Sequence, residues 1–157
     1  IRSVANFNGY WENEEATQAA FTSDGYFRTG DIGYLDEDGY LFIVDRKKDI
    51  IIRGGENISC PEVEAAAYEH DAVAELSVFG IADDRYGEVP GLVYFTKEGN
   101  ELSPDELKSF LQAKLAPFKV PVHFWRVHEP LPRLGTQKID RVTLRREYHA
   151  KVKELED

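Results

Sequence analysis

Hydrophobic positions in the first third of the chain predict a β-hairpin. Two apolar runs, Ile32–Leu35 and Tyr40–Val44, flank the acidic segment Asp36–Gly39. Two such runs that are joined by four turn residues ending in glycine are typical of antiparallel strands. We therefore expect these residues to form a hairpin.

The next stretch breaks the hydrophobic pattern and predicts a joint between two packed units. Residues 45–49 are five consecutive charged residues, and the apolar run Ile50–Ile52 follows them and leads into Gly54 and Gly55. We expect the apolar run to be a strand that delivers a flexible loop. Glycine suits a loop that must approach another group closely, because it lacks a Cβ and tolerates positive φ.

The remaining pattern predicts three helices. Ser59 and Ser103 each stand three residues before a glutamate, with a proline close behind, which is the pattern of a capped helix start. The first helix should run to about Glu69, Pro117 should stop the second, and the third should begin near Asp140. The apolar faces of these helices are expected to be Val63, Ala66 and Ala67, then Leu107, Phe110, Leu111 and Leu115, and finally Leu144, Tyr148, Val152 and Leu155.

Three further apolar runs, Val73–Ile81, Gly87–Thr96 and Pro121–His128, predict strands. Together with the helices they predict an α+β fold: a β-hairpin followed by a small α+β domain with a short mixed sheet flanked by helices.

Composition limits the size and setting of the protein. A chain of 157 residues with 42% hydrophobic side chains can bury one core, and so predicts one domain or one domain and a fragment. No apolar run is long enough for a membrane span and no basic-then-apolar leader is visible, so we expect neither a membrane span nor a secretory signal. It begins at Ile1 and contains no methionine, so we expect a piece of a longer protein. The single cysteine, Cys60, favours a reducing compartment such as the cytoplasm.

Charge argues against nucleic acid as a partner. The formal net charge is −10, whereas a nucleic-acid binder needs a basic face. Residues 119–153 nevertheless carry nine Lys or Arg against three acids. This segment could attract a small polyanion or could be a solvated basic helix face.

Histidine and cysteine positions favour neither a metal site nor a hydrolase. The four histidines are scattered without metal-ligand spacing, so no metal ligands are predicted. Cys60 lies at a predicted helix start, where its thiol could be reactive. We favour the alternative that it fills a gap between helix and sheet.

Four segments resemble ordered motifs of the adenylate-forming (AMP-binding) enzymes: Phe27–Asp31, Val44–Asp49, Arg53–Ile58 and Leu131–Arg141. This superfamily contains acyl-CoA and aryl-CoA synthetases, peptide-synthetase adenylation domains and firefly luciferase. The resemblance runs from about Gly9 to Arg141 and implies the C-terminal portion of such an enzyme. Residues 1–47 would end the large domain, and residues 48–157 would form the small mobile domain after a hinge.

The resemblance also implies a two-step reaction. ATP and a small-molecule carboxylate would give an acyl-adenylate and pyrophosphate, and the thiol of CoA would then displace AMP. Mg²⁺ would be bound by the large N-terminal domain, which this chain lacks and which would be its partner. The small domain would rotate between the steps, so the fragment alone is expected to be inactive.

Site residues follow from the motif positions that they match. Asp31 matches an aspartate that holds the ribose hydroxyls of the nucleotide, and Arg46 matches an arginine near ribose and phosphate. Lys48 falls at the hinge. Without the resemblance, a turn-capping aspartate, a surface ion pair and a solvated lysine are the alternative interpretations.

The small domain would carry two further elements. Gly54 and Gly55 match the loop that walls the pantetheine tunnel, although the same residues could make an ordinary tight turn. Lys138 matches the lysine that reaches the carboxylate and the α-phosphate during adenylation. Here the chain departs from the family pattern, because Gln137 stands where a glycine is usual and the glycine is shifted to Gly135.

Two alternatives to an acyl-CoA ligase remain at this stage. The same fold could load the phosphopantetheine of a carrier protein, as in peptide synthetases. The chain could also be a non-catalytic, ligand-binding α+β module, which the size of the native protein would decide.

Overall fold

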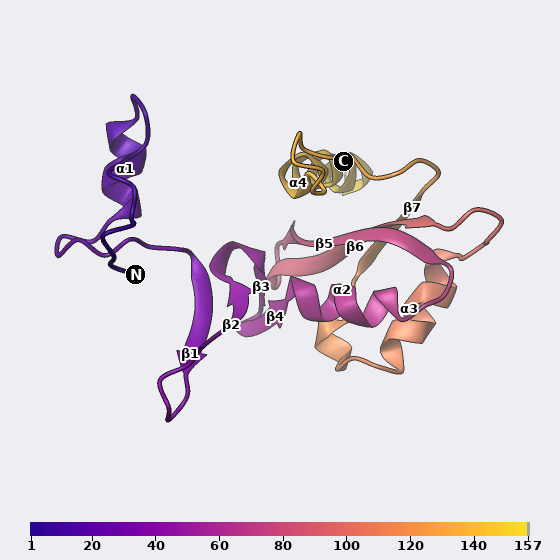
Figure 1. Ribbon diagram of the computed structural model, residues 1–157. Coiled ribbons are helices and arrows are strands. Elements are labelled where there is room, and N and C mark those ends of the chain that lie inside the picture. The colour runs from indigo at the N-terminus through magenta and orange to yellow at the C-terminus, as the bar shows by residue number, and fades with distance from the viewer. Residues whose placement is uncertain (157) are drawn as a thin grey trace. The chain divides into compact units, whose positions relative to one another are not determined.

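The computed structural model describes residues 1–156 and confirms the α+β fold (Figure 1). The chain separates into two compact units, Ile1–Lys48 and Asp49–Asp157. The first unit contains α1 (Glu14–Ala20), β1 (Asp31–Leu35) and β2 (Leu41–Arg46). The second contains β3 (Ile50–Arg53), β4 (Glu56–Ser59), α2 (Cys60–Tyr68), β5 (Val73–Asp83), β6 (Gly87–Thr96), α3 (Pro104–Gln112), η2 (Pro117–Lys119), β7 (His123–Val127) and α4 (Arg141–Glu156). The short 3₁₀ helix η1 (Lys47–Asp49) joins them.

The predicted hairpin is confirmed in the first unit. β1 and β2 pair antiparallel, and Asp31 lies opposite Arg46 while Leu35 lies opposite Leu41. The Asp36 carboxylate accepts a hydrogen bond of 2.8 Å from the backbone N–H of Tyr40, which closes the acidic turn. Such short-range bonds are the reason that Asp is favoured in turns.

The second unit is built on a five-stranded mixed sheet. The strand order is β4-β3-β6-β5, and β7 adds parallel to β6 while the other pairs are antiparallel. β6 is therefore the central strand. A parallel pair needs a long crossover, and here the segment through α3 and η2 supplies it.

Helices cover both faces of this sheet (Figure 1). Successive strand residues point to opposite faces, so Val78 of β5 joins the cluster under α2 and α3 while Phe79 joins the cluster under α4. On α4, Leu144, Tyr148 and Val152 are buried as predicted. The side chain of Leu155 lies outside the described residues.

One predicted capping box and one predicted helix end need correction. The Ser59 side chain accepts from the backbone N–H of Glu62, as expected, but the Glu62 carboxylate binds Lys119 instead of closing a capping box. α3 has the full box, yet it ends at Gln112 instead of at Pro117. Pro117 starts η2, a role that its fixed φ favours.

One strand was not predicted. β4 pairs antiparallel with β3, so Gly54 and Gly55 form the two-residue turn of a second hairpin. Both glycines have positive φ, +57° and +94°, as a tight hairpin turn requires. The polar residues Glu56 and Asn57 hide this strand because its sequence lacks the apolar run on which the prediction relied.

None of the helices in residues 1–156 combines the length and the apolar content that crossing a bilayer requires.

Candidate functional site

Asp31 and Arg46 lie opposite each other at the open end of the first hairpin. The Arg46 Nε and the Asp31 Oδ1 are 3.1 Å apart, and both side chains are partly exposed. The neighbouring Lys47 N–H donates to the Gly30 carbonyl over 2.8 Å, which holds the strands together at this end. Two residues that are fifteen positions apart in sequence thus form one polar site.

This pair can bind a ligand that carries hydroxyl groups as well as negative charge. The ion pair engages one carboxylate oxygen and one guanidinium nitrogen, so each group retains further atoms for a ligand. A carboxylate accepts hydrogen bonds from two hydroxyls, and a guanidinium donates to phosphate oxygens. The donor set of Asp31 and Arg46 therefore fits the ribose and phosphate of a nucleotide.

Lys48 is the last residue of the first unit. It lies in η1 and its side chain is exposed. Asp49, the first residue of the second unit, has its carboxylate 3.7 Å from the Arg141 guanidinium, so the chain is anchored directly after Lys48.

In the Gly54-Gly55 turn, Gly54 is in contact with Tyr86, whereas Gly55 faces open space. The N–H of Gly54 donates to the Tyr86 carbonyl over 2.8 Å, and a Cβ at Gly54 would lie 3.2 Å from the Tyr86 ring. A Cβ at Gly55 would meet no atom within 4 Å. The turn thus presents bare backbone to its surroundings, which leaves space for a narrow ligand.

Lys138 lies in the loop between β7 and α4, and its side chain is exposed. The loop is folded on itself: the Leu134 N–H donates to the Lys138 carbonyl over 2.8 Å, and the Asp140 N–H donates to the Pro132 carbonyl over 2.7 Å. Gln137, directly before Lys138, has φ +66°. Glycine adopts this left-handed conformation most readily, so the backbone has glycine-like geometry although the residue is glutamine.

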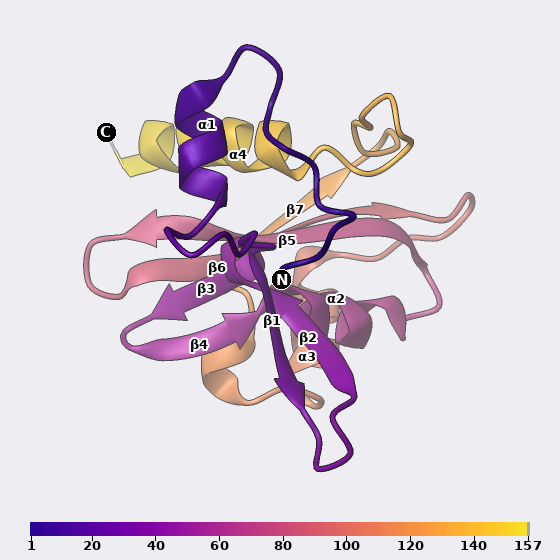
Figure 2. The same cartoon turned by 60° about the vertical axis from the view of Figure 1, so that its left-hand side comes forward.

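The loop that carries Lys138 and the β3–β4 turn lie apart within the second unit. Figure 2 shows the loop that precedes α4 and the β3–β4 turn on opposite sides of this unit. The turn contacts Tyr86 of the β5–β6 connection, and Leu131 and Ile139 of the loop pack beside α4. The structure therefore brings Asp31 together with Arg46 and places the loop that carries Lys138 away from the β3–β4 turn.

A buried network that the sequence did not indicate joins several of these elements. Glu64 of α2 is 7% exposed, accepts from the backbone N–H of Val78 over 2.9 Å, and binds Arg141 over 2.6 Å. Burial raises the pKa of the Glu64 carboxyl, and the Val78 N–H and Arg141 oppose this effect. Glu64 stands on the apolar side of its helix, and a charged residue at such a position is the feature of the sequence that could have indicated the buried network.

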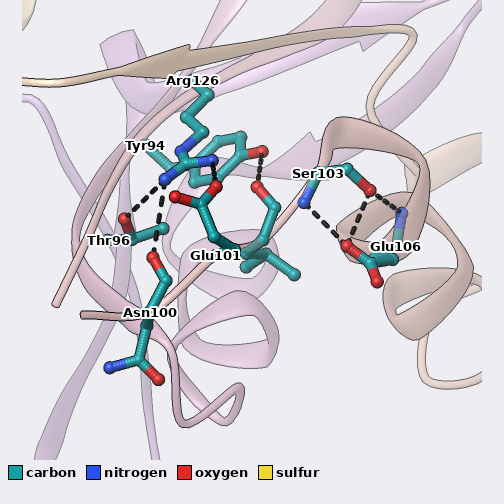
Figure 3. Close-up of polar contacts among 8 residues, drawn as sticks. Tyr94, Thr96, Asn100, Glu101, Ser103, Glu106 and Arg126 are labelled. Atoms are coloured by element: carbon teal, nitrogen blue, oxygen red, sulfur yellow. Dashed lines mark hydrogen bonds and ion pairs between the residues drawn. The ribbon is translucent and has the colours of Figure 1, made fainter. Parts of the chain in front are cut away.

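A second polar cluster connects β6, β7 and the segment before α3 (Figure 3). Arg126 binds the Glu101 carboxylate, the Thr96 hydroxyl and the Asn100 carbonyl beside a cavity of about 440 Å³. The nearby Tyr94 hydroxyl donates to the Leu102 carbonyl over 2.8 Å, and burial raises the pKa of this phenol to about 12. These groups hold the crossover to α3 against the sheet.

Metal-ligating side chains do not gather in the described part of the chain. Among residues 1–156, no group of three His, Cys, Asp or Glu side chains could hold a metal ion. Cys60 is buried in the cluster under α2, in agreement with a packing role.

Known proteins are similar to this chain in both sequence and fold. Residues 62–138 match the AMP-binding enzyme C-terminal domain. Over 137 residues the chain is 44% identical to the 2-succinylbenzoate–CoA ligase of Geobacillus sp. (strain WCH70), which covers 87% of this chain and 27% of that protein. It is 45% identical over 139 residues to the long-chain-fatty-acid–CoA ligase of Bacillus subtilis (strain 168), a match that covers 88% of this chain and 24% of that protein. The structure of ATP-bound MatB from Rhodopseudomonas palustris matches with a TM-score of 0.80 and 34% identity, and the match covers 91% of this chain and 28% of MatB.

The fold and these matches define the class, which is the C-terminal portion of the adenylate-forming enzymes. The chain belongs to the AMP-binding enzyme family and carries its C-terminal domain, and its relatives include CoA ligases. It spans about a quarter of the length of the curated relatives that it matches.

Proposed function

We propose that the full-length protein is an AMP-forming acid–thiol ligase that activates a carboxylate with ATP and transfers the acyl group to CoA. In the first step a carboxylate oxygen attacks the α-phosphorus, and pyrophosphate leaves. In the second step the CoA thiol, after losing its proton, attacks the acyl carbonyl, and AMP leaves. The family membership and the polar pair Asp31–Arg46 support this proposal.

The two units would divide this work. Asp31 would accept hydrogen bonds from the ribose hydroxyls, and Arg46 would bind ribose or phosphate oxygens. Lys138 would stabilise the negative charge that develops as the carboxylate attacks the α-phosphate. Gly54 and Gly55 would line the passage for the pantetheine arm, where side chains are excluded.

The observation that carries the proposal is the separation of the loop before α4, which contains Lys138, from the β3–β4 turn (Figure 2). A rigid domain can present only one of two opposed surfaces to a fixed nucleotide at a time. Rotation about Lys48, at the boundary between the units, would exchange the ammonium for the glycine passage. The domain limits that we propose are therefore 1–47 and 48–157, with Lys48 as the hinge.

The proposed N-terminal partner domain would cover the first hairpin. No side chain of residues 1–50 is buried, and Leu35, Leu41 and Phe42 of the hairpin are exposed. Apolar side chains in such a row need a packing partner. A preceding large domain would supply it, and would also bind Mg²⁺ together with ATP.

These residues specify the acyl substrate only as a carboxylate. One relative is named for 2-succinylbenzoate and another for long-chain fatty acids, so fatty acid metabolism is one of two candidate settings. We place the protein in the cytoplasm, where ATP and CoA would be available and where the buried Cys60 thiol would stay reduced. A carrier protein remains the second candidate acceptor, because its phosphopantetheine is the same thiol arm.

Half-reactions of the full-length enzyme test the proposal. Lys138→Ala should suppress carboxylate-dependent pyrophosphate release from ATP by a hundredfold or more, on the order seen for loss of one oxyanion-stabilising group. The same variant should still make thioester from supplied acyl-adenylate and CoA. Equal loss of both half-reactions, or acyl-adenylate formation by the isolated 157-residue chain, would contradict the scheme.

A further inference from the structure

The loop that carries Lys138 is tied to the edge strand β5 at its beginning. The Leu131 N–H donates to one oxygen of the Glu75 carboxylate over 2.9 Å, and Arg133 Nη2 donates to the other over 2.5 Å. Both oxygens of Glu75 are thus used by the first residues of the loop. The Glu75 side chain is 19% exposed, so this attachment is partly shielded from water.

The same arginine also holds the residue before Lys138. Arg133 Nη1 donates to the Gln137 carbonyl over 2.7 Å. The planar guanidinium therefore bridges β5 and the end of the loop with two different nitrogens, a geometry that a fixed fork of donors favours.

This carbonyl is well placed to control Lys138. The Gln137 C=O belongs to the planar peptide unit that also contains the Lys138 N–H and ends at the Lys138 Cα. Gln137 is held at φ +66°, which is costly for a residue with a side chain and persists only where surrounding contacts support it. The Arg133 hydrogen bond is such a contact, because it restrains the peptide plane directly after the strained residue.

We propose that Arg133, anchored by Glu75, is a positioning residue for adenylation. The pair fixes the peptide plane before Lys138, so that the ammonium is presented in one orientation to the carboxylate and the α-phosphate. This inference rests on the proposed role of Lys138. Glutamine at position 137 would otherwise leave the loop free to relax into a conformation with negative φ and a displaced Lys138.

A purely structural role predicts a different result, because a weakened fold would impair both half-reactions together. The thioester step uses the opposite surface of the domain under our proposal. The ratio of the two half-reactions therefore separates positioning from general destabilisation.

The experiment uses the full-length enzyme with Arg133→Gln and Glu75→Gln, and Arg145→Gln as the matched control. Arg145 also forms an ion pair, with Glu88 over 2.7 Å, but it lies on α4 outside the loop. Arg133→Gln should lower carboxylate-dependent pyrophosphate release at least tenfold, since displacement of a catalytic group by about 1 Å costs up to a hundredfold. Glu75→Gln should lower it by a smaller factor. Thioester formation from supplied acyl-adenylate should stay within twofold, and Arg145→Gln should leave both steps unchanged.

Two further measurements make the outcome decisive. In a Lys138→Ala background, Arg133→Gln should cause no additional loss, because its effect passes through Lys138. Amide hydrogen exchange should be faster at Leu134 and Gln137 in Arg133→Gln and unchanged in β6. Unchanged pyrophosphate release in Arg133→Gln, equal loss of both half-reactions, or an additive loss in the Lys138→Ala background would overturn the inference. If the wild-type enzyme forms no acyl-adenylate with any carboxylate, the proposed function itself fails as well, whereas an active wild type with an unaffected Arg133→Gln rejects only the positioning role.

Discussion

Removing Arg141 should destabilise the second unit in a pH-dependent way. Its guanidinium binds the Glu64 carboxylate over 2.6 Å and lies 3.7 Å from Asp49. Arg141→Met keeps most of the side-chain volume and removes the charge. Glu64 would then remain buried, with a hydrogen bond from the Val78 N–H but without the guanidinium.

The magnitude follows from the burial of the two groups. Loss of one partner from a fully buried ion pair costs about 3–5 kcal/mol. Arg141 is 38% exposed, and Glu64 keeps a backbone hydrogen bond, so solvent screening reduces the expected loss to about 2 kcal/mol at neutral pH. Glu64→Gln in the same chain should recover about half of this loss, because a neutral amide is cheaper to bury than a carboxylate.

The sign of the pH dependence follows from the raised pKa of Glu64. Its pKa in the folded chain lies above the ordinary value of 4.5, so the folded state holds more protons than the unfolded state between 4.5 and the folded value. The contribution of Glu64 to stability is therefore fully present below pH 4.5 and declines as pH rises through that window. Without Arg141 the pKa rises further, so the loss caused by Arg141→Met should shrink at pH 4.5.

Urea unfolding at pH 7.5 and pH 4.5 measures this effect, with tryptophan fluorescence as the signal because Trp125 packs in the cluster under α4. A loss of about 2 kcal/mol corresponds to a midpoint shift of roughly 1 M urea for a chain of this size. An equal loss at both pH values, or no recovery in the Glu64→Gln double variant, would refute the account of a buried carboxylate that depends on Arg141.

Three other changes give direct tests. In Gly91→Ala, the new Cβ would lie 2.8 Å from Trp125, so thermal unfolding should show a loss of about 1–3 kcal/mol, and an unchanged Tm would mean that the ring can move. The Ser103 N–H and hydroxyl lower the pKa of Glu106, and Ser103→Ala removes the hydroxyl while it keeps the N–H. The stabilisation that the hydroxyl adds exists above pH 4.5 and fades as pH falls, so the drop in Tm should be larger at pH 7 than at pH 3.5. A drop independent of pH would argue against the cap. Gly54→Val in the full-length enzyme should slow thioester formation and spare pyrophosphate release, because a side chain at position 54 would narrow the passage proposed for the pantetheine arm. The reverse pattern would exclude the proposed passage.

Local chemistry explains which elements could be predicted. The first hairpin, the start of α3 and the strands β5 and β6 depend on contacts within a few residues or on long apolar runs. A capping serine, an aspartate in a turn and alternating burial are all visible in the order of residues. β4 was missed because its polar residues are held as a strand by pairing with β3.

The sequence by itself therefore determined the α+β class, most element boundaries and, through its motifs, the family and the residues to examine. Only the tertiary structure decided how those residues are grouped: Asp31 against Arg46 on one hairpin, and the loop that carries Lys138 away from the β3–β4 turn on the second unit. The same holds for Arg133, which reaches Glu75 across 58 positions of sequence. The physical reason is that ion pairs and strand pairing join residues according to their separation in space, which neither hydrophobic periodicity nor motif spacing encodes.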